Sequence, residues 1–293
     1  MKKLVVILGP TASGKTEFAI HLAKKFQGEI ISADSRQVYK SLDIGTGKIT
    51  KKEMQGVPHH LLDVASPKRR FTVAHYQKKT RKAIQDIQKK DKLPFLVGGS
   101  PLYIYAVVDG WIIPEVPPNL KLRRKLEKLS VDKLLKRLQK LDPKRAKTIE
   151  QKNRRRLIRA LEIILSTGKP VPQLKKHPLP YSVLFIGTKK SSQQLQQNIK
   201  NRFLMMLKHG FLNEIKELRK QGLSWKRIES FGLEYREGTQ HLQSKISRNE
   251  MVEQVAKATV DFARRQMTWF KKDQRIHWIK NQREAENLIS LSF

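Results

Sequence analysis

The segment VVILGPTASGKT (Val5–Thr16) predicts an α/β protein with a parallel sheet. An apolar run, Leu4–Leu8, has the length and composition of a strand buried in such a sheet. It leads into a complete G-x-x-x-x-G-K-[ST] loop, Gly9–Thr16, and then into a helix-like run, Glu17–Phe26. A strand, a loop and a helix in this order are the context in which a P-loop holds phosphate groups.

This loop has the chemical groups that a phosphate site needs. The backbone N–H groups of the loop and the N-terminus of the helix form a cradle for anionic oxygens. Lys15 adds a positive charge near the outermost phosphate, and the Thr16 hydroxyl can hold Mg²⁺. The alternative, a glycine-rich turn that binds nothing, does not require the whole motif in this context. The sequence therefore predicts a phosphate or diphosphate site made of Gly9, Pro10, Thr11, Ala12, Ser13, Gly14, Lys15 and Thr16.

The bulk composition limits the class of protein and its partners. The 293 residues include 61 Lys and Arg against 26 Asp and Glu, which gives a net charge of +35. Such an excess favours a polyanionic partner, nucleic acid before membrane, although a general surface preference for lysine is the alternative. The chain has no cysteine, which excludes disulfides and thiolate zinc sites. No apolar run approaches the ~20 residues needed to span a bilayer, and the N-terminus shows no signal-peptide pattern. We expect a cytoplasmic monomer.

Two further strands bring polar residues to the edge of the sheet where the P-loop lies. A short strand at Gly28–Ala33 ends in Asp34-Ser35-Arg36-Gln37, and a strand at Leu93–Val97 ends in Gly98-Gly99-Ser100. Ligands of open parallel sheets gather at the carboxyl ends of the strands, so we expect Asp34 and Ser100 beside the P-loop. The alternative for Asp34 is a helix N-cap, since Gln37 stands at the capping-box spacing.

The segment 44–64 reads as a loop with one short helix. Its Pro58-His59-His60 could suggest a metal site, but adjacent histidines are poorly placed to share a metal and no acidic or cysteine cluster joins them. We favour a structural or substrate-lining role.

A basic helical segment interrupts the α/β core. We expect the core at 1–113 and 180–293 and an all-helical insertion at 114–179, with helices over 120–141, 143–149 and 153–166. Its repeated arginines either contact RNA phosphates or form a solvated charged face.

The rest of the chain returns to the sheet. The pattern predicts a strand at 181–187, one long helix at 195–218, a helix at 251–272 and an edge strand at 275–278. In the last helix we expect Met267, Trp269 and Phe270 to pack in the core.

Several segments in order carry a resemblance to a known family. They are GPTASGKT (9–16), ISADSRQVY (31–39), IGTGK (44–48), VPHHLLD (57–63), FTVAHY (71–76) and LVGGSPLYI (96–104), followed by matches at 153–162 and 202–278. Together they resemble the tRNA dimethylallyltransferases, which prenylate an adenosine beside the anticodon. The resemblance covers nearly the whole chain.

This resemblance implies a P-loop NTPase-like fold and assigns roles to residues. A dimethylallyl group would pass from dimethylallyl diphosphate to N6 of an adenosine in tRNA. Arg202 would grip the diphosphate opposite Lys15, with Mg²⁺ as cofactor, and Asp34 would accept a proton from N6. Ser100 stands where the family has a threonine. Asp34, Ser35, Arg36, Gln37 and Ser100 would hold the flipped base, and the anticodon arm would meet Arg123, Arg155, Arg156 and Arg159.

The chain departs from the family pattern at two places. Arg155-Arg156 replaces a usual Gln-Arg, which puts local sequence preference in doubt. The segment 228–237 replaces a shorter G-Y-x-E segment, and we assign it no role.

Two other classes of function remain open from the residues. A small-molecule P-loop kinase would bind ATP at the same loop, but the DSRQ, HHLLD and GGSPLY segments and the high charge argue against it. A non-catalytic RNA-binding P-loop protein would not require Lys15, Thr16, Asp34 and Arg202 together.

Overall fold

A computed structural model describes residues 2–114, 116–173 and 175–292 of the chain. The chain forms two compact units, one of Met1–Gly110 with Pro178–Phe293 and one of Trp111–His177. The helical insertion expected at 114–179 corresponds to the second unit.

The described residues of the first unit form a six-stranded parallel sheet with the order β3-β2-β4-β1-β5-β6. The central strand β1 pairs with β4 and β5, so that Val5 lies beside both Phe95 and Leu184. The predicted α/β sheet is confirmed, as is the edge strand near residue 276. The strands are β1 (Lys3–Leu8), β2 (Gly28–Ser32), β3 (His59–His60), β4 (Leu93–Gly98), β5 (Ser182–Gly187) and β6 (Ile276–Trp278).

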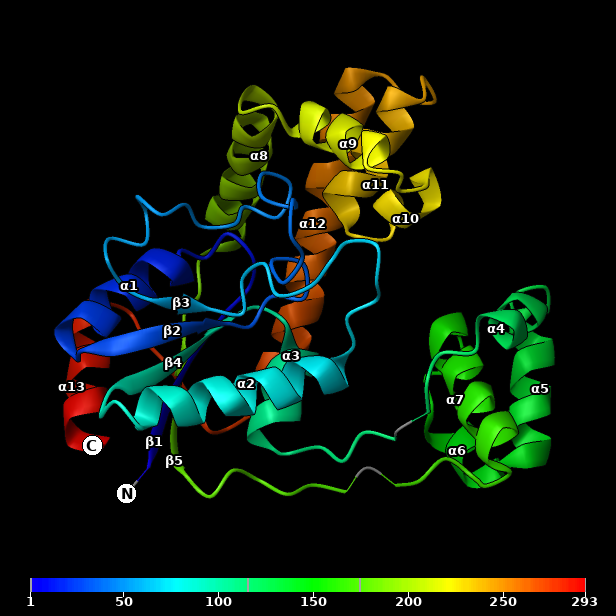
Figure 1. Cartoon of the computed structure of the whole chain (residues 1–293), viewed down its shortest axis with the longest axis horizontal. Coiled ribbons are helices and arrows are strands. Elements are labelled where there is room, and N and C mark those ends of the chain that lie inside the picture. Colours follow the sequence, from blue (N-terminus) through cyan, green and yellow to red (C-terminus); the bar gives the residue numbers. More distant parts are fainter. Residues whose placement is uncertain (1, 115, 174, 293) are drawn as a thin grey trace. The chain divides into compact units, whose positions relative to one another are not determined.

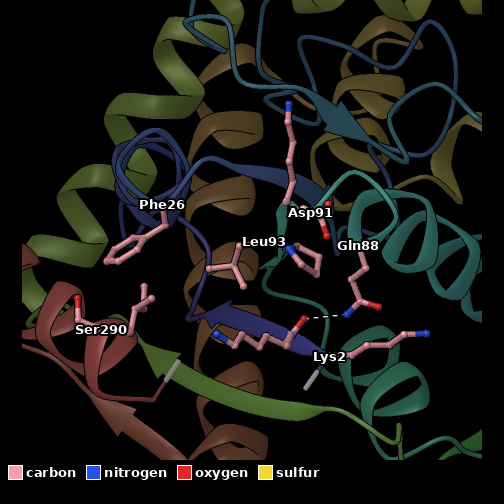
Figure 2. Close-up of a pocket in the computed structure, with 10 residues that line it drawn as sticks. Lys2, Phe26, Gln88, Asp91, Leu93 and Ser290 are labelled. Carbon is pink, nitrogen blue, oxygen red and sulfur yellow. Dashed lines mark hydrogen bonds between the residues drawn. The ribbon is translucent and has the colours of Figure 1, made fainter.

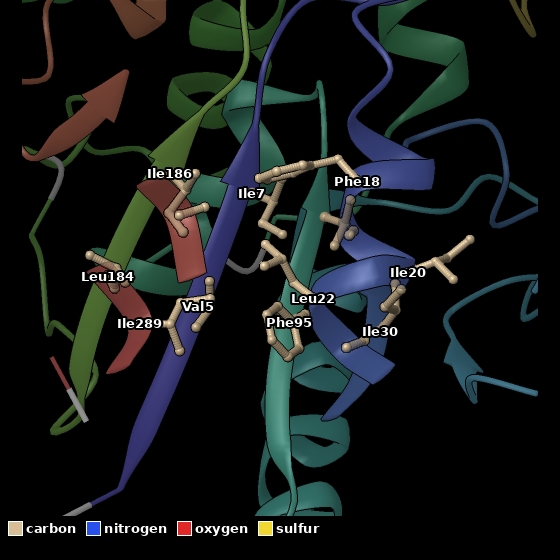
Figure 3. Packing of buried hydrophobic residues seen from close by; sticks show 14 of the residues in the cluster. Val5, Ile7, Phe18, Ile20, Leu22, Ile30, Phe95, Leu184, Ile186 and Ile289 are labelled. Carbon is tan, nitrogen blue, oxygen red and sulfur yellow. The ribbon is translucent and has the colours of Figure 1, made fainter. Parts of the chain in front are cut away.

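Helices cover both faces of this sheet. Because side chains alternate along a strand, Val5 and Ile7 of β1 face one side, where they join a core with α1 (Lys15–Lys25) and α13 (Gln282–Ser292) (Figure 3). The other face packs against α2 (Val73–Gln88), with α3 (Pro101–Val108) beside α2 (Figure 1). The sheet is therefore buried on both faces, as its continuous apolar strands predict.

A layer of helices continues the first unit beyond the sheet (Figure 1). The prediction of one helix over 195–218 is wrong. The helix is interrupted at Gly210, whose φ of 95° is unfavourable for other residues. Two helices, α8 (Ser192–Lys208) and α9 (Phe211–Lys220), take its place. They pack with α10 (Trp225–Glu229), α11 (Leu233–Leu242) and α12 (Arg248–Phe270).

Two other elements and one side chain of the first unit differ from the sequence-based expectation. The segment 44–64 has turns and β3 but no helix in the described residues. The helix α13, which buries Ala285 and Ile289, is absent from the prediction. Trp269 is 41% exposed, so of the three side chains expected in the core there only Phe270 is fully buried.

The second unit is a small helical bundle around its own apolar core. The predicted helix 120–141 is split, because the Ser130 hydroxyl accepts the N–H of Lys133 and starts a new helix. The unit contains α4 (Leu120–Leu126), α5 (Val131–Leu141), α6 (Pro143–Thr148) and α7 (Arg154–Thr167). No helix in the described parts of either unit is long and apolar enough to cross a membrane.

Candidate active site

The P-loop is fixed to the carboxyl end of β5. The Ser13 hydroxyl lies 2.9 Å from the hydroxyl of Thr188, the residue after β5. A Cβ atom at Gly9 would come within 2.5 Å of the same hydroxyl, so the loop approaches β5 too closely for a side chain there. Gly14 has a φ of 84°, which lets the loop turn into α1. Gly9 and Gly14 are thus required by the geometry of the loop.

Gln266 of α12 ties the P-loop to the neighbouring strand end. Its side-chain oxygen accepts the N–H of Thr11 at 2.9 Å, and its side-chain nitrogen donates to the carbonyl of Gly99 at 2.5 Å. Gln266 is 3% exposed. No role for Gln266 was predicted from the sequence, although it lies inside a segment that resembles the family.

The cations at the loop act on one another. The Lys15 ammonium donates to the carbonyl of Pro10 at 3.0 Å. Burial, followed by the positive charge of Arg202, lowers the pKa of Lys15 to about 8, while Asp34 opposes the shift. The charges of Arg202 and Asp34 therefore both act on Lys15. Thr16, the predicted Mg²⁺ ligand, is exposed at the start of α1.

Asp34 shapes a turn at the end of β2. Its Oδ1 accepts the N–H groups of Arg36 at 2.7 Å and Gln37 at 3.4 Å. The alternative that Asp34 is a helix N-cap is wrong, because the residues that follow it make a turn and no helix. The N–H of Ser35 donates to the Ser100 hydroxyl at 3.3 Å. The two strand ends are thus joined, and the predicted proximity of Asp34 and Ser100 is found.

Arg202 reaches this edge of the sheet through the loop 43–48. Its guanidinium donates to the carbonyl of Thr46 at 3.0 Å, and a Cβ atom at Gly47 would lie 2.0 Å from its Nη2. The Gln37 side chain donates to the carbonyls of Thr46 at 3.4 Å and Gly47 at 3.2 Å. Gln37 was predicted to hold a base, but its side-chain N–H groups donate to this loop.

The segment 228–237, to which no role was assigned, supplies a carboxylate to the same region. Glu234 is half-buried near the start of α11. Burial raises the pKa of its carboxyl, and the charges of Arg202, Asp34 and Arg36 also act on it. The site thus has two carboxylates and several cations.

The second unit uses two of its predicted RNA-binding arginines internally. Glu162 is 0% exposed. Arg123 donates to both of its oxygens, at 2.7 and 2.6 Å, and Arg159 donates to one of them at 2.7 Å. Burial alone would raise the pKa of Glu162, but the hydrogen bonds from these arginines outweigh it and lower the pKa.

Arg123→Ala is expected to destabilise the second unit by about 3 kcal/mol, because it removes a partner of a buried carboxylate. Hydrogen exchange of the α7 amides in the full chain measures this loss, with Arg155→Ala as the control. Since the pKa of Glu162 is lowered in the fold, its contribution is present above the unfolded value of about 4.3 and is lost as pH falls through the folded value. Exchange as slow in Arg123→Ala as in Arg155→Ala would contradict the role of this ion cluster.

Arg155 and Arg156 remain available on the surface of α7. Both are exposed; Arg156 pairs only with the exposed Glu150, at 3.3 Å, and the Arg155 side chain has no hydrogen-bond or ion-pair partner among the described residues. These two are better placed for an RNA phosphate than Arg123 and Arg159.

Two other places on the first unit contain polar groups or a hollow. The Nε2 of His60 donates to the carboxylate of the buried Glu29 at 2.7 Å, and the described residues contain no cluster of three or more potential metal-binding side chains. A hollow of about 660 Å³ lies at the amino ends of the strands, away from the P-loop (Figure 2). There Gln88 already donates to the carbonyl of Lys3 at 2.9 Å, and Lys92 pairs with Glu29 at 3.2 Å. Neither place has the convergent groups of the P-loop edge.

Comparison with known sequences gives a consistent result. Residues 37–273 match the family model described as IPP transferase. The chain is 41% identical over 281 residues to a tRNA dimethylallyltransferase of Anoxybacillus flavithermus, covering 94% of this chain and 90% of that protein. It is 39% identical over 297 residues to one of Carboxydothermus hydrogenoformans, covering 99% and 95%.

Solved structures that resemble the chain are described as enzymes of the same kind. A tRNA isopentenylpyrophosphate transferase of Bacillus halodurans superposes with a TM-score of 0.75 at 35% identity, covering 100% of this chain and 97% of that one. A eukaryotic dimethylallyltransferase described as acting on tRNA gives a TM-score of 0.77 at 29% identity, covering 92% and 70%.

Proposed function

The chain belongs to the IPP transferase family, and on that premise we propose that it transfers a dimethylallyl group from dimethylallyl diphosphate to a tRNA. The acceptor is N6 of the adenosine on the 3′ side of the anticodon, and the products are N6-dimethylallyladenosine and diphosphate. The observation that carries the proposal is the meeting of a P-loop, two cations and a carboxylate at one edge of the sheet.

The cations serve the departure of diphosphate. When the allylic C1–O bond breaks, its electron pair leaves with the diphosphate, so negative charge grows on that oxygen. We assign Lys15, Arg202 and backbone N–H groups of the P-loop to the place where this charge develops. Fixed donors and cations at such a point lower the barrier most, because they need no rearrangement during the reaction.

The carboxylate serves the attacking amine. As the N6 lone pair forms the new N–C1 bond, a proton must leave the nitrogen. Asp34 is the acceptor we assign, because Oδ1 is used by the turn and the second oxygen is left for the substrate. Ser100 holds the backbone of Ser35 and so fixes the position of Asp34.

Mg²⁺ fits these residues as an ion that arrives with the diphosphate. This cation keeps several waters and typically takes one or two protein ligands plus phosphate oxygens. Thr16 offers one exposed hydroxyl, and the described residues offer no carboxylate cage. When bound, the ion would neutralise charge on the diphosphate.

The target base must leave its stack to reach a site inside a protein. We assign the turn Asp34–Gln37 to the flipped adenosine and the exposed Arg155 and Arg156 to the anticodon arm. All of these groups come from one chain, so the reaction needs no second copy and we propose a monomer.

Mass analysis of an anticodon stem-loop tests the reaction. An unmodified stem-loop with adenosine 3′ of the anticodon is incubated with the protein, Mg²⁺ and either dimethylallyl diphosphate or ATP. A gain of one C5H8 unit with the prenyl donor alone is expected. Consumption of ATP without that gain, on the stem-loop and on full-length tRNA, would instead establish a kinase.

The pH dependence should report the perturbed lysine. The pKa of Lys15 is lowered to about 8, so the ammonium loses its proton, and the site a positive charge, as pH rises through this value. We expect kcat/KM for dimethylallyl diphosphate, which reports the free enzyme, to fall above that pH. A profile that stays flat well above pH 8 would contradict this assignment.

Arg155→Ala combined with Arg156→Ala should weaken tRNA binding and reduce its salt dependence. Each lost phosphate contact makes the negative slope of log K against log salt concentration less steep by about 0.7–0.9. Titrations at several salt concentrations measure it, with the exposed Lys220→Ala of α9 as the control. An unchanged slope would mean that this face of α7 is a solvated charged surface that does not contact RNA phosphates.

A further inference from the structure

Glu214 of α9 makes an unusual set of contacts with the loop 43–48. Its Oε2 accepts the N–H groups of Asp43 at 2.8 Å and Ile44 at 2.7 Å, and its Oε1 accepts that of Gly45 at 3.0 Å. Three successive backbone N–H groups thus converge on one carboxylate, in an anion-binding concavity of the kind known as a nest. The carboxylate sets the conformation of the loop.

Tyr235 of α11 fixes that carboxylate in turn. Its hydroxyl donates to Oε1 of Glu214 at 2.6 Å, and its ring is 1% exposed, packed edge-on against Phe211 and Phe231. A Cβ atom at Gly45 would meet the rings of Phe211 and Tyr235 within 2.7 Å, so the loop lies directly on this aromatic cluster. The loop therefore has a rigid support on one side.

On its other side the same loop holds Arg202. The carbonyl of Thr46 accepts from the guanidinium at 3.0 Å, and Gly47 lies flat against it, as the 2.0 Å approach of a Cβ atom shows. Arg202 is the cation whose charge acts on Lys15. A continuous set of contacts thus runs from Tyr235 and Glu214 through the loop to the cations of the P-loop edge.

We propose that Glu214, fixed by Tyr235, is a positioning residue that places Arg202 for binding the diphosphate of the donor. This inference rests on the proposed function, because it takes Arg202 as a diphosphate ligand. Glu214 itself touches no substrate, since its oxygens are used by the loop and by Tyr235. The segment 228–237 thereby has a role, because Tyr235 within it fixes Glu214.

Glu214→Gln tests the proposal, because the amide keeps the shape but loses the charge and one of the two acceptor oxygens. We expect the dissociation constant for inorganic diphosphate to rise about 10- to 100-fold, as for a displaced binding group. Affinity for tRNA should stay within about twofold. Calorimetry measures both, and hydrogen exchange should quicken at the amides of residues 43–45. Tyr235→Phe, which keeps the ring, should show the same pattern more weakly.

The control is Glu217→Gln on the same helix, where the side chain is 60% exposed and, among the residues that the structure describes, pairs only with Lys220. A double-mutant cycle with Arg202→Ala separates positioning from general stability. If Glu214 acts through Arg202, Glu214→Gln adds little to the loss that Arg202→Ala already causes. A full additional loss in that background, or normal diphosphate affinity in Glu214→Gln, would overturn the proposal. If Arg202→Ala binds diphosphate as the unmodified protein does, the proposed function of this site fails instead.

Discussion

Asparagine at position 34 is expected to lower kcat about 10²- to 10⁴-fold, the range for loss of a positioned general base. The substitution keeps Oδ1, which accepts the N–H groups of Arg36 and Gln37, so the turn persists. It removes the negative charge and the ability to accept a proton. The affinity for tRNA should therefore change little, and single-turnover kinetics with saturating donor should show the loss in the chemical step.

Asp91→Asn provides a matched control for this experiment. Asp91 is exposed, lies in a turn after α2, and has a φ of 55°, a conformation that asparagine tolerates. It should leave the rate unchanged. A rate near normal in Asp34→Asn would remove Asp34 as the base and direct attention to Glu234, the other carboxylate near Arg202.

Alanine at position 15 is expected to lower kcat/KM for dimethylallyl diphosphate about 10²- to 10³-fold, the cost of removing one fixed donor from a developing charge. The ammonium of Lys15 lies at the P-loop, where it donates to the carbonyl of Pro10. Its removal leaves Arg202 as the cation beside the loop. Initial rates at varied donor concentration, with tRNA held saturating, measure the effect.

Lys24→Ala on the same helix is the control, since that lysine is exposed and donates to Gln55 at 2.8 Å. It should behave as the unmodified protein. Donor kinetics in Lys15→Ala close to those of Lys24→Ala would mean that the P-loop does not hold the diphosphate. The KM for tRNA should be the same in all three proteins.

Much of the α/β unit could be predicted because local patterns determine it. The apolar strands, the P-loop and the polar residues after β2 and β4 follow from composition and from the rule that strand ends share an edge. The break at Gly210 was missed because a glycine inside a helical pattern is tolerated or not according to its packing. Trp269 was misjudged for a related reason, since helical spacing does not say which side of α12 is covered.

The contacts that organise the site are long-range, and single-sequence reasoning has no access to them. Gln266 lies far along the chain from Thr11, and Glu214 far from Asp43. Arg123 and Arg159 looked like surface cations because the burial of Glu162 is a property of the folded bundle. In each case the sequence shows the residue and its chemistry but does not show which other residue it contacts.

The lowered pKa of Lys15 has a consequence for the end of the reaction cycle. The positive charges of Lys15 and Arg202 repel each other, and any molecule that carries a diphosphate relieves that repulsion. Under the proposed function, the donor and the released diphosphate compete for the same cations. We therefore expect product inhibition, with turnover that depends on the ratio of donor to free diphosphate and on any pyrophosphatase that removes the diphosphate.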